Sequence, residues 1–172
     1  MKDNESAIRG GSLKEEYKRI WARYYAKYIK AMREEGIAIS AISVQNEPIA
    51  KQSWESCYYS PEDERDFIEK YLAPVLDQEG LSEIKIIIWD HNKERAIEHI
   101  DAFMADPDAA AKVDGFAFHW YSGDHFEALD LLRQRYPDKL LVHTESCPLH
   151  MPGKALSMSP GEDGVLNNAW DA

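Results

Sequence analysis

Four short apolar runs recur along the chain, and a cluster of polar residues follows each of them. The runs are rich in β-branched and aromatic residues, which favours buried β-strands over helices. They cover residues 37–44, 84–89, 115–118 and 140–143. The clusters that follow them are Gln45-Asn46-Glu47-Pro48, Asp90-His91-Asn92, His119-Trp120-Tyr121 and Thr144-Glu145-Ser146-Cys147. We therefore predict that four strands carry functional groups to one edge of a sheet.

Helical patterns alternate with these runs. Apolar residues at helical spacing predict a long first helix that opens with a capping box at Ser12–Glu15 and ends at Gly36. A second helix is predicted to begin after Ser60 and to bend near Pro74. The alternation of strand and helix indicates a parallel sheet with crossover helices. The remaining predicted helices cover residues 95–104 and a segment with Phe126, Leu129 and Leu132 facing inward.

Two α/β architectures satisfy this alternation, a doubly wound open sheet and a (β/α)8 TIM barrel. The open sheet normally carries a glycine-rich phosphate loop after an early strand, and the sequence has none. Polar clusters after several successive strands favour the barrel, whose active site collects residues from many strand ends. A whole barrel needs about 250 residues. The 172 residues therefore predict a partial barrel over residues 1–148 and an irregular tail over 149–172.

The composition narrows the range of partners. A net charge of -11 argues against binding to nucleic acid and to anionic membrane surfaces. No stretch approaches the roughly 18 apolar residues of a membrane span, and the first residues lack the apolar core of a signal peptide. We therefore expect no stable membrane insertion and a cytoplasmic location, or a secreted one if the true N-terminus is missing.

The cysteines and histidines indicate neither a disulfide framework nor a metal site. Cys57 and Cys147 are too few for such a framework, and we expect free thiols. The six histidines show no metal-ligand spacing on one predicted element, so we expect no metal and no other cofactor. They are His91, His99, His119, His125, His143 and His150.

Glu47 and Glu145 form the candidate catalytic pair. Each follows a predicted parallel strand, so both are expected at one edge of the sheet. Hydrolysis of a β-glycoside needs one protonated carboxyl group as the acid and one ionised carboxylate as the nucleophile, about 5 to 5.5 Å apart in a retaining enzyme. The alternative interpretation is that both glutamates are ordinary solvated loop residues.

The ordered motifs of the chain resemble those of glycoside hydrolase family 30, the glucosylceramidase-like enzymes. The resemblance covers roughly residues 10–148 and includes Asn46-Glu47-Pro48 and Thr144-Glu145-Ser146-Cys147. In that family the acid/base residue follows barrel strand four and the nucleophile follows strand seven, which implies that this chain holds strands four to seven. The other matching motifs are Gly11-Ser12-Leu13, Trp21-Ala22-Arg23-Tyr24, Trp89-Asp90-His91-Asn92 and His119-Trp120-Tyr121.

The resemblance implies roles for the residues around the reacting bond. Glu47 would act as general acid and then as base. Glu145 would be the nucleophile that forms a covalent glycosyl-enzyme. Asn46 would bond the sugar 2-hydroxyl, and Tyr121 would orient the nucleophile.

Five further residues complete the predicted substrate site. By resemblance, Trp120 would pack against the glycone, and His119 would anchor either the sugar or a loop. Asp90 and Asn92 resemble rim residues that shape the pocket. Trp54, on the irregular stretch after Pro48, residues 49–60, is either a sugar-stacking residue or part of the packing of a long loop.

The resemblance also sets out the substrate and the alternatives to catalysis. The leading substrate is a β-linked glucoside, and a β-1,6-glucan or a β-xyloside are the alternatives. A half barrel exposes two sheet edges, so a second hypothesis is a catalytically inactive fragment that self-associates through those edges. A third hypothesis is a degenerate sugar-binding module. The expected partner of an active protein is a carbohydrate or glycolipid substrate.

Overall fold

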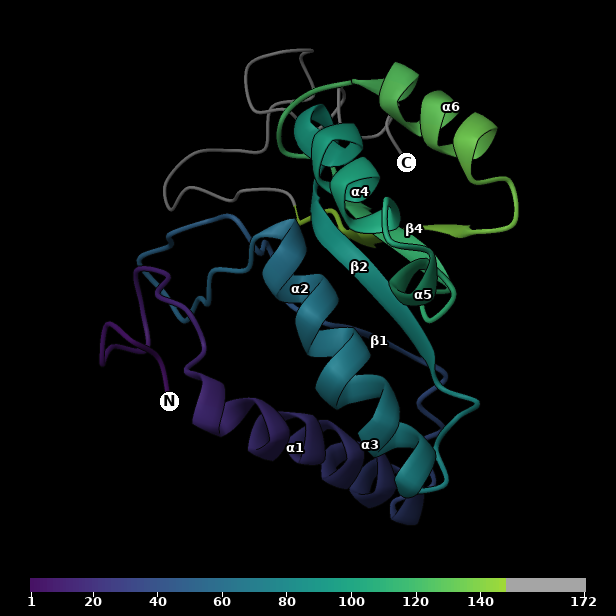
Figure 1. Cartoon of the computed structure of the whole chain (residues 1–172). Helices are drawn as coiled ribbons and strands as arrows, with labels where there is room; N and C mark the ends of the chain where they lie inside the picture. The colour runs from purple at the N-terminus through teal and green to yellow at the C-terminus, as the bar shows by residue number, and fades with distance from the viewer. Residues whose placement is uncertain (148–172) are drawn as a thin grey trace.

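The computed structural model describes residues 1–147, and within them four strands form one parallel sheet (Figure 1). The strands pair in chain order, each with the next one along the sequence. This order confirms the predicted parallel α/β architecture. Pro148 and the predicted tail over 149–172 lie outside the described residues. The strands are β1 (Ala41–Ser43), β2 (Lys85–Asn92), β3 (Gly115–His119) and β4 (Leu140–Glu145).

Helices join the strands and gather on one side of the sheet (Figure 1). Between helices and sheet lies an apolar core that includes Phe67, Ile88 and Phe103, all of them fully buried. None of the helices within residues 1–147 is long and apolar enough to span a bilayer. The helical segments are α1 (Glu15–Glu34), α2 (Pro61–Phe67), η1 (Ile68–Leu72), α3 (Ala73–Gln78), η2 (Lys93–Arg95), α4 (Ala96–Met104), α5 (Pro107–Ala110) and α6 (Phe126–Arg135).

The two predicted helix caps have opposite outcomes. The capping box at Ser60 is confirmed, because its hydroxyl accepts the backbone N–H of Asp63 and the Asp63 carboxylate accepts the N–H of Ser60. The capping box at Ser12 is wrong, because α1 begins only at Glu15 and no side chain caps it. Ser12 instead forms a bridge to Tyr58, so its backbone is committed to tertiary pairing.

The second long helix, which runs from α2 through η1 to α3, widens by one turn just before Pro74. A single π-helical turn, η1, joins α2 to α3 there. Proline has no N–H, and its ring crowds the carbonyl four residues earlier, which here belongs to Lys70. The wider π-helical turn accommodates the proline without breaking the helix.

The outer strands are less buried than the sequence predicts. We expected the run 37–44 to be buried on both faces, but β1 has only three residues and Ile37 is 53% exposed. No residue of β4 is fully buried either. Both strands lie at an edge of the four-stranded sheet, whereas β2 and β3 have a neighbour on each side. Self-association through these edges stays a prediction.

One inward-facing prediction in the last helix is also wrong. Phe126 is 39% exposed and lies under the ammonium group of Lys93, 5.0 Å from the ring centre. The helix α6 buries Ala128 and Leu132 instead. Ala128 and Leu132 are four residues apart and share one face of α6, whereas Phe126, the first residue of the helix, lies on another face.

Candidate active site

The carboxyl end of the central strand β2 is bent by a bulge. Its register against β3 shifts between Trp89 and His91. Trp89 and Asp90 have φ values of +74° and +49°, and Glu47 after β1 has +48°. The Glu47 N–H donates to the Asp90 carbonyl over 2.9 Å, which fastens the two strained segments together. Such backbone strain and bulges are typical of functional sites.

Asp90 is the centre of a polar network that draws on all four strands. Its carboxylate accepts hydrogen bonds from the hydroxyls of Ser43 (2.5 Å, β1) and Thr144 (2.6 Å, β4). It also accepts a bond from Nε2 of His119 (3.1 Å, β3). Burial raises the pKa of Asp90, but these three bonds outweigh it and hold the pKa below its usual value. Asp90 is therefore an ionised carboxylate with only 7% exposure.

His119 lies between the two candidate catalytic carboxyl groups. Its ring is fully buried, with Nδ1 3.4 Å from Oε1 of Glu47 and Nε2 3.9 Å from Oε2 of Glu145. The distance between the two carboxyl groups is therefore at most the sum of these two contact distances and the width of one imidazole ring. Burial lowers the pKa of His119, but the hydrogen bond to Asp90 and the surrounding carboxylates raise the pKa above its usual value.

The second oxygen of Glu47 has a partner that the sequence did not indicate. The side-chain amide of Gln52 donates to Oε2 of Glu47 over 2.5 Å. His91 also approaches Glu47, at 3.9 Å, but its Nδ1 accepts the N–H of Asn92 and burial lowers the pKa of this imidazole. His91 is therefore a neutral neighbour of Glu47 rather than its ion-pair partner.

Glu145 has a different surrounding. The hydroxyl of Tyr121 donates to Oε1 of Glu145 over 2.9 Å and itself accepts the N–H of Cys147 over 3.0 Å. Burial and the neighbouring carboxylate raise the pKa of Tyr121, so the phenol keeps its proton and stays a donor. The side chain of Asn92 accepts the N–H of Tyr121 and holds this segment against β2.

A cavity of about 480 Å³ opens above these groups, within the range of about 300–1,000 Å³ for small-molecule sites. Three of the predicted site residues do not line it. His119 and Asp90 lie buried beneath its floor, so Asp90 is not the rim residue we predicted. Trp120 is buried at 8% exposure, and its contact with a glycone stays a prediction. The lining residues are Asn46, Glu47, Gln52, Trp54, Asn92, Tyr121, Glu145 and Cys147.

Comparison with known proteins now decides the family. A sequence profile of the glycosyl hydrolase family 30 TIM-barrel domain matches residues 2–155. The chain belongs to glycoside hydrolase family 30. Membership confirms the resemblance drawn from the motifs and identifies the parallel sheet as part of a TIM barrel.

Three similar proteins show the extent of the match. SrfJ from Salmonella typhimurium is 38% identical, with a TM-score of 0.85 over 94% of this chain and 35% of its own. A solved endo-β-1,6-glucanase is 34% identical, with a TM-score of 0.75 over 81% of this chain and 32% of its own. The putative glucosylceramidase 3 of Caenorhabditis elegans is 31% identical over 81% of this chain and 29% of its own length. The chain thus spans about a third of these relatives.

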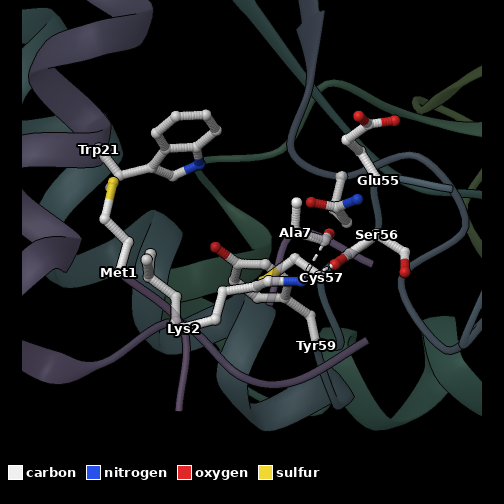
Figure 2. Close-up of a pocket in the computed structure, with 10 residues that line it drawn as sticks. Met1, Lys2, Ala7, Trp21, Glu55, Ser56, Cys57 and Tyr59 are labelled. Carbon is white, nitrogen blue, oxygen red and sulfur yellow. Dashed lines mark hydrogen bonds between the residues drawn. The ribbon is translucent and has the colours of Figure 1, made fainter. Parts of the chain in front are cut away.

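The candidate site includes a loop, residues 49–60, that the N-terminal segment holds in place and that supplies Gln52 and Trp54 to the cavity. The N–H of Arg9 donates to the carbonyl of Gln52 over 2.8 Å. The ammonium group of Lys2 donates to the backbone carbonyl of Ser56, and Figure 2 shows this lysine extending toward the loop. These backbone contacts fix the part of the loop that carries the amide next to Glu47. No sequence motif marked this role, because it depends on contacts between distant segments.

Thiols and metals complete the description of the candidate site. Cys57 and Cys147 are both free, as predicted. Burial raises the pKa of the Cys57 thiol, which favours its neutral form. Residues 1–147 contain no group of three histidine, cysteine or acidic side chains placed to hold a metal ion. The expectation that the protein needs no metal stays a prediction.

Proposed function

We propose that the complete protein is a retaining β-glycoside hydrolase with Glu145 as nucleophile and Glu47 as general acid and base. One observation carries this proposal: the two carboxyl groups share one cavity, contact the same imidazole and have different hydrogen-bond partners. Glu145 is held by the Tyr121 hydroxyl, whereas Glu47 is held by the Gln52 amide. A pair of carboxyl groups in unlike surroundings is what a double displacement requires.

The first step forms a glycosyl ester. An ionised oxygen of Glu145 attacks the anomeric carbon while the bond from that carbon to the leaving oxygen breaks. Glu47 gives its proton to the leaving oxygen, so the aglycone departs as a neutral alcohol. Asn46 lines the same cavity, beside Glu47, where its amide is available to the sugar 2-hydroxyl.

The second step returns the protein to its starting state. Glu47, now ionised, takes a proton from a water molecule, and the resulting hydroxide attacks the anomeric carbon. The ester bond to Glu145 breaks and the carboxylate is regenerated. Two inversions at the same carbon retain the β configuration.

The leading substrate class is a β-linked glucoside, for example a glucosyl lipid. Similarity to a putative glucosylceramidase, at 31% identity over 81% of the chain, supports this class. A second candidate is β-1,6-glucan, supported by the 34% identity with a solved endo-β-1,6-glucanase. The ratio of kcat/KM values for glucosylceramide, a β-1,6-linked glucan and an aryl β-xyloside on the complete protein distinguishes these substrates.

A mechanism-based label tests the nucleophile. We expect an activated 2-deoxy-2-fluoro-β-glucoside to inactivate the complete protein and to leave a fluoroglucosyl ester on the peptide that contains Glu145, measured by mass spectrometry. Glu145→Gln should abolish labelling, whereas Glu127→Gln, an exposed glutamate on α6, should not change it. A label on another residue, or release of an α-configured first product in an NMR time course, would reject the proposal.

A further inference from the structure

The buried carboxylate of Asp90 has no part in the double displacement, yet four strands converge on it. It accepts hydrogen bonds from Ser43, Thr144 and His119 and takes no part in lining the cavity. A buried charge costs folding free energy unless it is paired and hydrogen-bonded. A carboxylate that collects three donors at a strained strand end is therefore placed for a purpose beyond packing.

The network fixes the orientation of the imidazole. Asp90 is ionised and only accepts, so Nε2 of His119, 3.1 Å away, must carry a hydrogen. Nδ1 then faces Oε1 of Glu47 at 3.4 Å and has no hydrogen-bond partner among the described residues. The ring orientation thus follows from Asp90, and the ring in turn separates Glu47 from Glu145.

We propose that Asp90 is a positioning residue for both catalytic carboxyl groups, acting through the orientation and charge of His119. The inference rests on the proposed function, because it names the groups to be positioned as the acid/base and the nucleophile. With Asp90 ionised, the imidazole is held as a cation, with Nδ1 3.4 Å from Glu47 and Nε2 3.9 Å from Glu145. The charge of His119 therefore keeps both groups within reach of one anomeric carbon.

Several titratable groups surround His119, and they set the sign of the expected pH effect. From β2 it faces Asp90 and the neutral His91, and from β4 it faces Glu145. From the segment after β1 it faces Glu47, and the ring of Tyr121 lies edge-on at 6.0 Å. The carboxylates all favour the imidazolium. Loss of the closest one makes His119 release its proton at lower pH.

The test is Asp90→Asn in the complete protein, since asparagine keeps the shape but not the charge. We expect kcat to fall about 10- to 100-fold, as for loss of a charged hydrogen bond, with KM within about twofold. The basic limb of the kcat/KM profile should move to lower pH. Asp101→Asn is the matched control, because Asp101 also accepts two side-chain hydrogen bonds, from Arg135 and Tyr136, but lies away from the cavity. It should leave both kcat and the pH profile unchanged.

A second measurement does not depend on activity. In protein labelled with ¹⁵N-histidine, we expect His119 to keep its Nε2 proton and to titrate above pH 6.5 in the wild type, and at lower pH in Asp90→Asn; His119→Gln assigns the signal. If the wild type hydrolyses none of the glycosides, the proposed function fails while this titration still decides the Asp90–His119 coupling.

Two further variants test the inference if Asp90→Asn does not fold. Thr144→Val and Ser43→Ala each remove one donor to Asp90 and should give smaller shifts in the same direction. A wild-type kcat and pH profile in folded Asp90→Asn, or a His119 titration that does not move, would overturn the inference. Equal shifts in Asp101→Asn would overturn it as well.

Discussion

The floor of the cavity and the loop above it are built in opposite ways. The floor consists of strand ends, where Asp90 and His119 are buried and joined through side-chain hydrogen bonds. The loop over residues 49–60 has no regular structure and carries Trp54 at 54% exposure, and its backbone is held by the N-terminal segment. Rigid strand ends suit the chemistry, since reacting groups must keep their geometry. An exposed loop suits the choice of leaving group.

The largest loss of activity is expected at Glu47, the residue that we propose transfers a proton in the reaction. Glu47→Gln removes the proton donor and should lower kcat/KM about 10²- to 10⁴-fold for substrates with a poor leaving group. The loss should be much smaller for a dinitrophenyl glucoside, whose leaving group departs without a proton. The measurement is a plot of kcat/KM against leaving-group pKa for both proteins. A uniform loss over the series would reject Glu47 as the acid.

An intermediate effect is expected where the loop reaches down to the floor. Gln52→Leu removes the amide that donates to Glu47 over 2.5 Å. As Glu47 gives up its proton, this contact becomes a charged hydrogen bond of about 1.5 kcal/mol or more. We expect a loss of about tenfold in kcat/KM for poor leaving groups. Gln78→Leu, on the exposed end of α3, is the control and should retain full activity. Equal activities of Gln52→Leu and Gln78→Leu would show that the Gln52 amide does not contribute to catalysis.

The smallest effect is expected at the exposed tip of the loop. Trp54→Ala removes an aromatic face that lines the cavity, and such contacts contribute about 0.5 to 1.5 kcal/mol. We expect KM to rise up to about tenfold with kcat nearly unchanged. Trp54→Phe should restore most of the binding, and Tyr28→Ala, an exposed aromatic on α1, should have no effect. A fall in kcat rather than a rise in KM would show that Trp54 affects the chemical step and not only substrate binding.

The fold and the candidate catalytic pair were within reach of the sequence because both depend on local order. Short apolar runs and helical patterns predict each strand and helix separately, and parallel strands must bring their carboxyl ends to one edge. Glu47 and Glu145 follow such strands, and the structure places them in one cavity. The motifs around them were sufficient to identify the family.

The supporting contacts were out of reach because they join residues far apart in the chain. Asp90 stands in a polar motif typical of a solvated rim, yet the bulge in β2 turns it inward to meet Ser43 and Thr144. Ser12 has the local sequence of a helix cap but is committed to pairing with Tyr58. In each case tertiary pairing overrides the local preference.

The sequence by itself determined the order of strands and helices and the two glutamates that follow the strands. Only the tertiary structure decided which polar residues are buried, which nitrogen of His119 faces which carboxyl group, and that Gln52 contacts Glu47. The physical reason is range. Secondary structure follows from the covalent neighbours of a residue, whereas burial and hydrogen-bond partners depend on which distant segments fold against it.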